Sequence, residues 1–440
     1  MGRLASLFTT GLLTLLVAVH GVYADHWVQT WGSMPQLTEP HNLPPAPYNE
    51  TGLVFRNTTL RQTVRATIGG DWLRIRISNA FGVSDLPITA VSIALPTKGS
   101  AGVPTIQPRT SRKVTFSGES SFIVPNGAQV LSDPIRFSTP PQSMLSITIY
   151  TAQGQTTNYI TSHPGSRTTS WMARGNQVDA LDLESLGEDE RASTNHWYWV
   201  SSVETWADDN VGSLVIVGDS ITDGRGSNDN NNDRWPDLLL ARLQSSRQTR
   251  DIAVINQAAG GNRILYDGLG PNALGRIDRD VLAHPGVKYA MIYEGVNDIG
   301  TGATTEEAQK IIGDRMIWAY RQMVERLHTS GIPVIGATIT PMSGPGQGYG
   351  HPTREATRQR VNRWIRTSGV FDAVIDFDRV VRDPEIPEQL KPEYDTGDYL
   401  HPNVAGFQAM ADAIPLDLFR RLDRLGRGRG GRVPPGVRDL

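Results

Sequence analysis

Two short motifs in this sequence hold the side chains that nucleophilic catalysis needs. Ser220 ends the run Gly218-Asp219-Ser220, directly after the apolar segment Leu214 to Val217. A serine at such a strand end can expose its hydroxyl and its own backbone amide above a sheet. His401 precedes Pro402, which disfavours helical backbone at His401 and predicts a loop there.

Asp398 stands three residues before His401, a spacing that lets its carboxylate bond one ring nitrogen. The other nitrogen can then accept a proton, as the general base of a serine hydrolase must. A turn serine that bonds only local backbone, and a surface histidine near a helix start, are the alternative interpretations. The chain contains no cysteine, which excludes cysteine nucleophiles and thiolate metal sites.

Glycine and asparagine follow two further apolar runs. Asn297 lies in Gly295-Val296-Asn297-Asp298, after the run Tyr289 to Tyr293. Gly260 and Gly261 lie in the segment Asn256 to Asn262, after a run that ends at Ile255. An asparagine amide and an unobstructed glycine amide can both donate hydrogen bonds to an oxyanion. Plain turns are the alternative, since these residue types are turn formers.

The order of these four clusters resembles the SGNH or GDSL hydrolase family over Leu214 to Ala413, with Ile221 where the family name has leucine. The resemblance implies a flavodoxin-like α/β domain that cleaves carboxylic esters without a cofactor or a metal. It implies Ser220 as nucleophile, His401 as base and Asp398 as the residue that orients it. The implied oxyanion donors are Ser220, Gly261 and Asn297, with Gly260 as a rival to Gly261.

The elements after Gly212 support an α/β arrangement, because continuous apolar runs alternate with helical segments. The predicted strands are Leu214 to Val217, Ile252 to Ile255, Tyr289 to Tyr293, Pro333 to Ile339 and Ala373 to Phe377. The predicted helices are Trp235 to Ser245, Thr305 to Thr329, Arg354 to Thr367 and Val404 to Leu422. Asn403 is the predicted N-cap of the last helix.

The segment from Trp27 to about Ala207 predicts an all-β, sandwich-like domain. Leu73-Arg74-Ile75-Arg76-Ile77 alternates as a half-buried strand does, and similar short runs follow it. The acidic stretch from Asp179 to Asn195 predicts a surface loop. Trp27, Trp31 and Trp72 are expected in the core. This part is an addition to the minimal family domain and resembles, less specifically, the N-terminal extension of larger secreted members.

The ends of the chain differ from the rest. Arg3 and the apolar stretch Leu4 to Val19 predict a signal peptide at 1–24, and hence secretion; a signal anchor is the alternative. We then expect the β-sandwich-like domain at 25–207, the hydrolase domain at 208–425 and a disordered basic tail at 426–440. The sequons at Asn49 and Asn57 are glycan acceptors if the secretory pathway is eukaryotic.

Composition limits the partners. With a net charge of −3 we expect no nucleic acid, and with no second long apolar run we expect no stable membrane insertion. The polar loop Gly224 to Asp233 favours soluble or polysaccharide-linked esters, such as acetyl groups, as the substrate. A lipase or phospholipase, an acyltransferase, and a carbohydrate-binding protein with an inactive hydrolase half are the alternatives. The sequence does not predict the oligomeric state.

Overall fold

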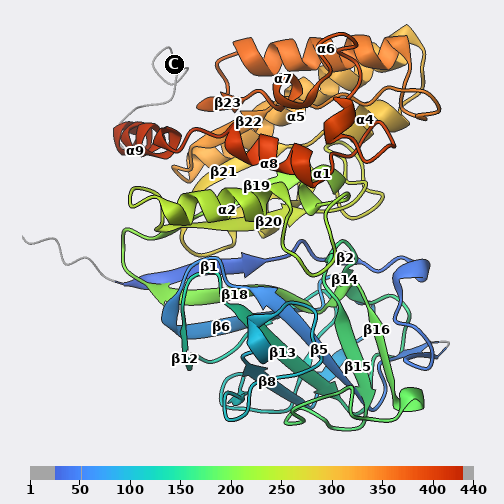
Figure 1. The fold of residues 1–440 in the computed structure, drawn as a ribbon, viewed down its shortest axis with the longest axis vertical. Coiled ribbons are helices and arrows are strands. Elements are labelled where there is room, and N and C mark those ends of the chain that lie inside the picture. Colours follow the sequence, from blue (N-terminus) through green and yellow to red (C-terminus); the bar gives the residue numbers. More distant parts are fainter. Residues whose placement is uncertain (1–24, 51, 430–440) are drawn as a thin grey trace, which may run out of the picture.

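The computed structural model describes residues 25–50 and 52–429; the predicted signal peptide at 1–24 lies outside these residues. Figure 1 shows a β-rich part, which holds the earlier residues, beside an α/β part formed by the later ones. Each part has its own cluster of buried apolar side chains. The two parts are in contact, and that contact matters for the site described below.

The α/β part is built on one parallel sheet. Its strands are β19 (Gly212–Gly218), β20 (Ile252–Ala258), β21 (Val287–Tyr293), β22 (Val334–Ala337) and β23 (Ala373–Ile375). They lie in the order β20-β19-β21-β22-β23, which is the 2-1-3-4-5 order of flavodoxin-like folds. All of β19 is buried, as expected for a strand covered on both faces. The predicted fold class is confirmed.

Helices connect and cover these strands. They are α1 (Ser220–Asp223), α2 (Trp235–Ser245), α3 (Ala273–Ile277), α4 (Val296–Thr301), α5 (Glu306–Thr329), α6 (Pro352–Thr367), α7 (Phe377–Val381), α8 (Val404–Asp412) and α9 (Asp417–Arg429). The α2 helix packs against α8, and α5 packs against α6. Asn403 caps α8 by accepting a hydrogen bond from the Gly406 amide, as predicted.

The single last helix predicted over Val404 to Leu422 is wrong. The chain leaves the helix after Asp412 and starts α9 at Asp417, because Pro415 has no amide hydrogen for a helical bond. The new helix is anchored by the buried side chains of Leu418, Phe419 and Leu422. It runs to Arg429, so residues 426–429 of the predicted tail are helical, and 430–440 lie outside the described residues.

The β-rich part consists mainly of two antiparallel sheets that enclose a common core, as predicted. One sheet has the order β1 (His26–Gly32), β18 (Val200–Ala207), β6 (Gly70–Ser78) and β11 (Gln129–Leu131), and β12 (Ile135–Thr139) also pairs with β6. The other has the order β16 (Arg191–Thr194), β15 (Ser170–Arg174), β5 (Thr58–Arg65), β13 (Met144–Thr151), β8 (Ala90–Ala94) and β9 (Arg112–Val114). Leu73, Ile75 and Ile77 are buried, as the alternation in β6 requires.

Three smaller sheets complete the described portion of this part. They are β2 (Gln36–Leu37), β14 (Thr161–His163) and β17 (Trp197–Tyr198) in one sheet, β7 (Leu86–Ile88) with β10 (Phe122–Val124), and β3 (Asn49–Glu50) with β4 (Leu53–Val54). The small sheet of β2, β14 and β17 carries His163, which reaches the α/β part.

Two expectations for the β-rich part are wrong. The predicted surface loop over Asp179 to Asn195 contains β16, because Arg191–Thr194 pair with β15 and form the edge strand of that sheet. Trp72 is 41% exposed and therefore not a core residue, whereas Trp31 is buried. Trp27 is half-buried, and the Arg74 guanidinium lies 3.9 Å from its ring centroid.

The first strand joins the two parts. β1 lies along β20, and Val28 packs within the core of the α/β part. The Gln29 amide donates to the Pro285 carbonyl at 3.3 Å. Nearer the site, the Asn230 side chain exchanges hydrogen bonds with Thr169 of the β-rich part. None of the helices in the described part of the chain is long and apolar enough to cross a bilayer.

Candidate active site

Ser220 lies at the turn between β19 and α1. Asp219 caps the short helix, because its carboxylate accepts a hydrogen bond of 3.0 Å from the Ile221 amide. Gly224 ends the helix with a left-handed φ of 103°. The turn thus places the Ser220 side chain at the carboxyl end of the sheet, where sites form in this architecture.

His401 and Asp398 meet Ser220 at this edge, as the sequence predicted. The Ser220 hydroxyl lies 2.8 Å from His401 Nε2, and His401 Nδ1 lies 2.6 Å from Asp398 Oδ2. The other oxygen of Asp398 accepts hydrogen bonds from the amides of Leu400 and His401. Partial burial raises the pKa of Asp398, but the hydrogen bonds from His401 outweigh this and hold that pKa well below its usual range.

The two glycines of the loop after β20 have different roles. The Gly260 amide donates to Asp223 Oδ2 at 2.9 Å and is therefore occupied. Among the described residues the Gly261 amide has no acceptor, and the same holds for the Ser220 amide. Gly261 has a φ of +71°, and a Cβ there would lie 2.4 Å from a methyl carbon of Leu269. The geometry therefore favours Gly261 over Gly260 as an oxyanion donor.

Asn297 is the second residue of α4, two positions after Gly295 with its φ of 121°. Its Nδ2 donates to the Asn262 carbonyl at 2.8 Å, and its Oδ1 accepts from the Tyr349 hydroxyl at 2.9 Å. These two bonds fix which end of the amide group is the donor. The second N–H of Nδ2 has no acceptor among the described residues, so Asn297 can donate to a substrate oxygen.

A group of buried charged side chains lies at the ends of β19 and β20, next to the loops that carry the site residues. The sequence analysis did not predict this group. The Arg276 guanidinium donates to the carbonyls of Gly218 and Gln257 and pairs with Asp280 and Glu294. Burial raises the pKa of Glu294 well above its usual range, that of Asp219 to about 7 and that of Asp298 to about 6. The sequence gives no clear signal for Arg276, because it stands beside other charged residues, Asp278, Arg279 and Asp280.

A pocket of about 500 Å³ opens over Ser220. The α/β part lines it with Ser220, Asp223, Arg225, Gly260, Gly261, Leu269, Asn297, Tyr349, Leu400 and His401. The β-rich part lines it with Gln36, Glu39, His41, Asn42, Pro164, Gly165, Arg167 and His196. Sequence reasoning missed this second set, because nothing in the pattern placed the small β14 sheet beside Ser220.

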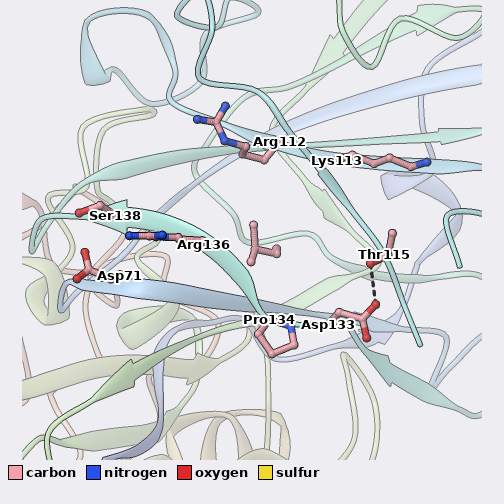
Figure 2. Close-up of a pocket in the computed structure, with 9 residues that line it drawn as sticks. Asp71, Arg112, Lys113, Thr115, Asp133, Pro134, Arg136 and Ser138 are labelled. Atoms are coloured by element: carbon pink, nitrogen blue, oxygen red, sulfur yellow. Dashed lines mark hydrogen bonds between the residues drawn. The ribbon is translucent and has the colours of Figure 1, made fainter. Parts of the chain in front are cut away.

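A second hollow, of about 640 Å³, lies on the β-rich part and is shown in Figure 2. Arg112, Lys113 and Arg136 extend around it, and Asp133 bonds Thr115 at its edge. It contains none of the predicted site residues. The pocket over Ser220 is therefore the candidate active site. Within the described residues, no three His, Asp or Glu side chains are grouped as metal ligands.

Comparison with known proteins supports a hydrolase domain. The GDSL-like Lipase/Acylhydrolase family model matches residues 216–409. Similar solved structures include a GDSL-like lipase from Bacteroides thetaiotaomicron (18% identity, 48% of this chain and 88% of that chain, TM-score 0.34). The lipase/acylhydrolase from Enterococcus faecalis shares 20% identity over 49% of this chain and 97% of its own, with a TM-score of 0.36. An acetylxylan esterase from Geobacillus stearothermophilus shares 22% sequence identity over 48% of this chain and 94% of its own, with a TM-score of 0.35.

No curated protein matches the chain. The segment that the family model matches contains Ser220, Gly261, Asn297, Asp398 and His401. Together with the sheet order, this match confirms the resemblance seen in the sequence. Over residues 216–409, its C-terminal part, the chain is thus similar to the GDSL-like Lipase/Acylhydrolase family.

Proposed function

We propose that the chain is a serine esterase that hydrolyses carboxylic esters through an acyl-enzyme. One observation carries this proposal: the continuous hydrogen-bond chain from Ser220 through His401 to Asp398 at the floor of a pocket. A hydroxyl held 2.8 Å from an imidazole nitrogen can lose its proton to that nitrogen as it attacks.

In the first half of the reaction, Ser220 Oγ bonds to the ester carbonyl carbon and His401 Nε2 takes its proton. The oxyanion accepts hydrogen bonds from the amides of Ser220 and Gly261 and from Asn297 Nδ2. The C–O bond to the alcohol then breaks, and His401 returns the proton to the leaving oxygen. Water attacks the acyl-enzyme with His401 again as base, which releases the acid and restores Ser220.

The lining of the pocket supports a polar substrate with a short acyl group. The residues from the β-rich part are mostly polar or charged, including Gln36, Asn42 and Arg167. Such groups suit the hydroxyls of a carbohydrate, whereas a long acyl chain needs a continuous apolar surface. The substrate we propose is therefore a small or polysaccharide-linked ester, such as an acetyl ester. We further propose secretion, with residues 1–24 removed before Asp25.

The first experiment compares the purified mature chain with Ser220→Ala on 4-nitrophenyl acetate. We expect kcat/KM to fall roughly a thousandfold or more, with circular dichroism unchanged. Near-normal turnover by the variant would show that Ser220 is not the nucleophile. A fluorophosphonate probe should label the wild type at Ser220, whereas a carbohydrate-binding protein with an inactive site would stay unlabelled.

A lipase or phospholipase is the second candidate, because the family model includes lipases. The preferred acyl chain length distinguishes a short-chain esterase from a lipase. We expect kcat/KM to fall as the acyl group of a 4-nitrophenyl ester lengthens from acetate to decanoate. A rise along that series would favour the lipase.

A further inference from the structure

His163 crosses from the β-rich part to the active-site helix α1. It ends strand β14, and its Nε2 lies 2.9 Å from Asp223 Oδ1. The side chains are 5% and 4% exposed, so water competes little for this contact. The Trp197 ring stacks on the imidazole, with centroids 5.7 Å apart. A buried histidine–carboxylate pair thus joins the two parts of the molecule beside Ser220.

Each ring nitrogen of His163 lies against a hydrogen-bond acceptor. Its Nδ1 lies 3.0 Å from the Met34 carbonyl oxygen, which only accepts hydrogen bonds, and its Nε2 faces a carboxylate. An imidazolium donates to both, whereas a neutral ring would direct a lone pair at an acceptor. The charged and titratable groups nearby include His196, whose pKa is lowered by burial, Arg234, which lies over the Trp197 ring, and Asp219, which interacts with Asp223. The ring is therefore held at both nitrogens, between the Met34 carbonyl and the Asp223 carboxylate.

Asp223, which His163 holds in place, also contacts the loop after β20. Its Oδ2 accepts the hydrogen bond from the Gly260 amide, and Gly261 is the next residue. Gly165, two residues after His163, is packed directly on the same carboxylate. A Cβ at Gly165 would lie 1.7 Å from Asp223 Oδ2. The β-rich part therefore holds Asp223 from two directions, and Asp223 in turn holds the peptide that precedes the oxyanion donor.

We infer that His163 is a positioning residue for the oxyanion hole, acting through Asp223 and Gly260 on the Gly261 amide. This inference rests on the proposed esterase function, and it gives the β-rich part a role in catalysis. The Gly261 amide stabilises charge only if it points at the oxyanion, so an unrestrained loop loses transition-state stabilisation more than ground-state binding. Loss of the His163 contact should therefore lower kcat and change KM little.

The test measures kcat and KM of His163→Gln on 4-nitrophenyl acetate. We expect kcat to fall roughly ten- to hundredfold, because small displacements of catalytic groups have effects of that size; KM should stay within about twofold. The matched control is His328→Gln, which breaks another histidine–aspartate contact, with Asp372 at 2.8 Å, whose residues do not line the pocket. This control should keep the wild-type kcat.

Adding Asp223→Asn to His163→Gln distinguishes positioning from packing. The amide keeps an acceptor for the Gly260 N–H and removes the carboxylate charge that His163→Gln leaves unpaired, so part of the lost kcat should return. If His163 only fills space, the second substitution lowers kcat further. Gly165→Ala is the variant to use if His163→Gln does not fold, and it should lower kcat by displacing Asp223.

A kcat within twofold of wild type for folded His163→Gln, or for Gly165→Ala, would overturn the inference. Ser220→Ala is measured in parallel. If it retains activity, the proposed function fails; if it is inactive while His163→Gln is normal, only the role of His163 fails.

Discussion

Asp398 accepts two hydrogen bonds from a single residue, His401: one from the ring Nδ1 at 2.6 Å and one from the backbone amide at 2.8 Å. Each carboxylate oxygen takes one of them, so the carboxylate fixes the ring relative to its own backbone. Tyr399, between the two residues, has a left-handed φ of 58°, which closes this tight loop. The imidazole thereby presents Nε2 to Ser220 in one orientation.

This relationship predicts the effect of Asp398→Asn. The amide keeps the size of the side chain but cannot stabilise the imidazolium, and its NH₂ group favours the wrong ring tautomer. We expect kcat to fall about 10⁴-fold with the fold intact. Steady-state kinetics on an acetyl ester measure it, and less than a tenfold loss would remove Asp398 from the proposed catalytic role.

The neighbouring glycines of the oxyanion loop offer a matched pair of variants. Gly261→Ala puts a Cβ 2.4 Å from Leu269 at a φ of +71°, so the loop must move. At Gly260 the nearest atom to an added Cβ is Asp223 Oδ2 at 3.9 Å, an ordinary contact. We expect Gly261→Ala to lower kcat at least tenfold more than Gly260→Ala. The reverse order in kinetic assays would return the donor role to Gly260.

Sequence pattern could predict the catalytic domain because its signals are local. The continuous apolar run Leu214 to Val217 indicates a strand buried on both faces, and Ser220 follows it immediately. Asp398 and His401 are close in the sequence, so their contact needs only a loop. Pro415 is also a local signal, because a proline has no amide hydrogen for a helical bond, and it marks the break between α8 and α9.

The contact between His163 and Asp223 could not be predicted in this way. The two residues are separated by 60 positions and belong to different parts of the chain. His163 ends a strand of only three residues, which is too short for a hydrophobic period to be read. The choice between Gly260 and Gly261 also required coordinates, since it depends on which amide Asp223 occupies.

Two substitutions test Asn297 as an oxyanion donor: one removes the donor group, and the other removes only the Tyr349 hydroxyl that orients it. Asn297→Ala removes the Nδ2 donor, and we expect kcat to fall about a hundredfold or more while KM changes little. Tyr349→Phe removes only the hydroxyl that donates to Asn297 Oδ1, so kcat should fall roughly two- to tenfold. Both are measured on the same ester, and an unchanged kcat for Asn297→Ala would exclude it from the oxyanion hole.

Asp219 links the site to the pH dependence of stability. Burial raises its pKa to about 7, from 3.8. Between these values the folded chain binds a proton at Asp219 that the unfolded chain has released. This contribution to the free energy of unfolding is therefore complete below pH 4 and is lost as pH rises to about 7. The slope is at most about 1.4 kcal/mol per pH unit.

Asp219→Asn should remove that dependence, since an amide does not titrate and can still accept the hydrogen bond from the Ile221 amide. We expect the stability of the variant relative to wild type to increase between pH 4 and pH 7, as measured by urea unfolding at several pH values. His284 titrates with the opposite sign, because burial lowers its pKa to about 3, but it is present in both proteins and cancels in the difference. A difference in stability that stays constant over this range would mean that Asp219 is ionised in the folded chain throughout.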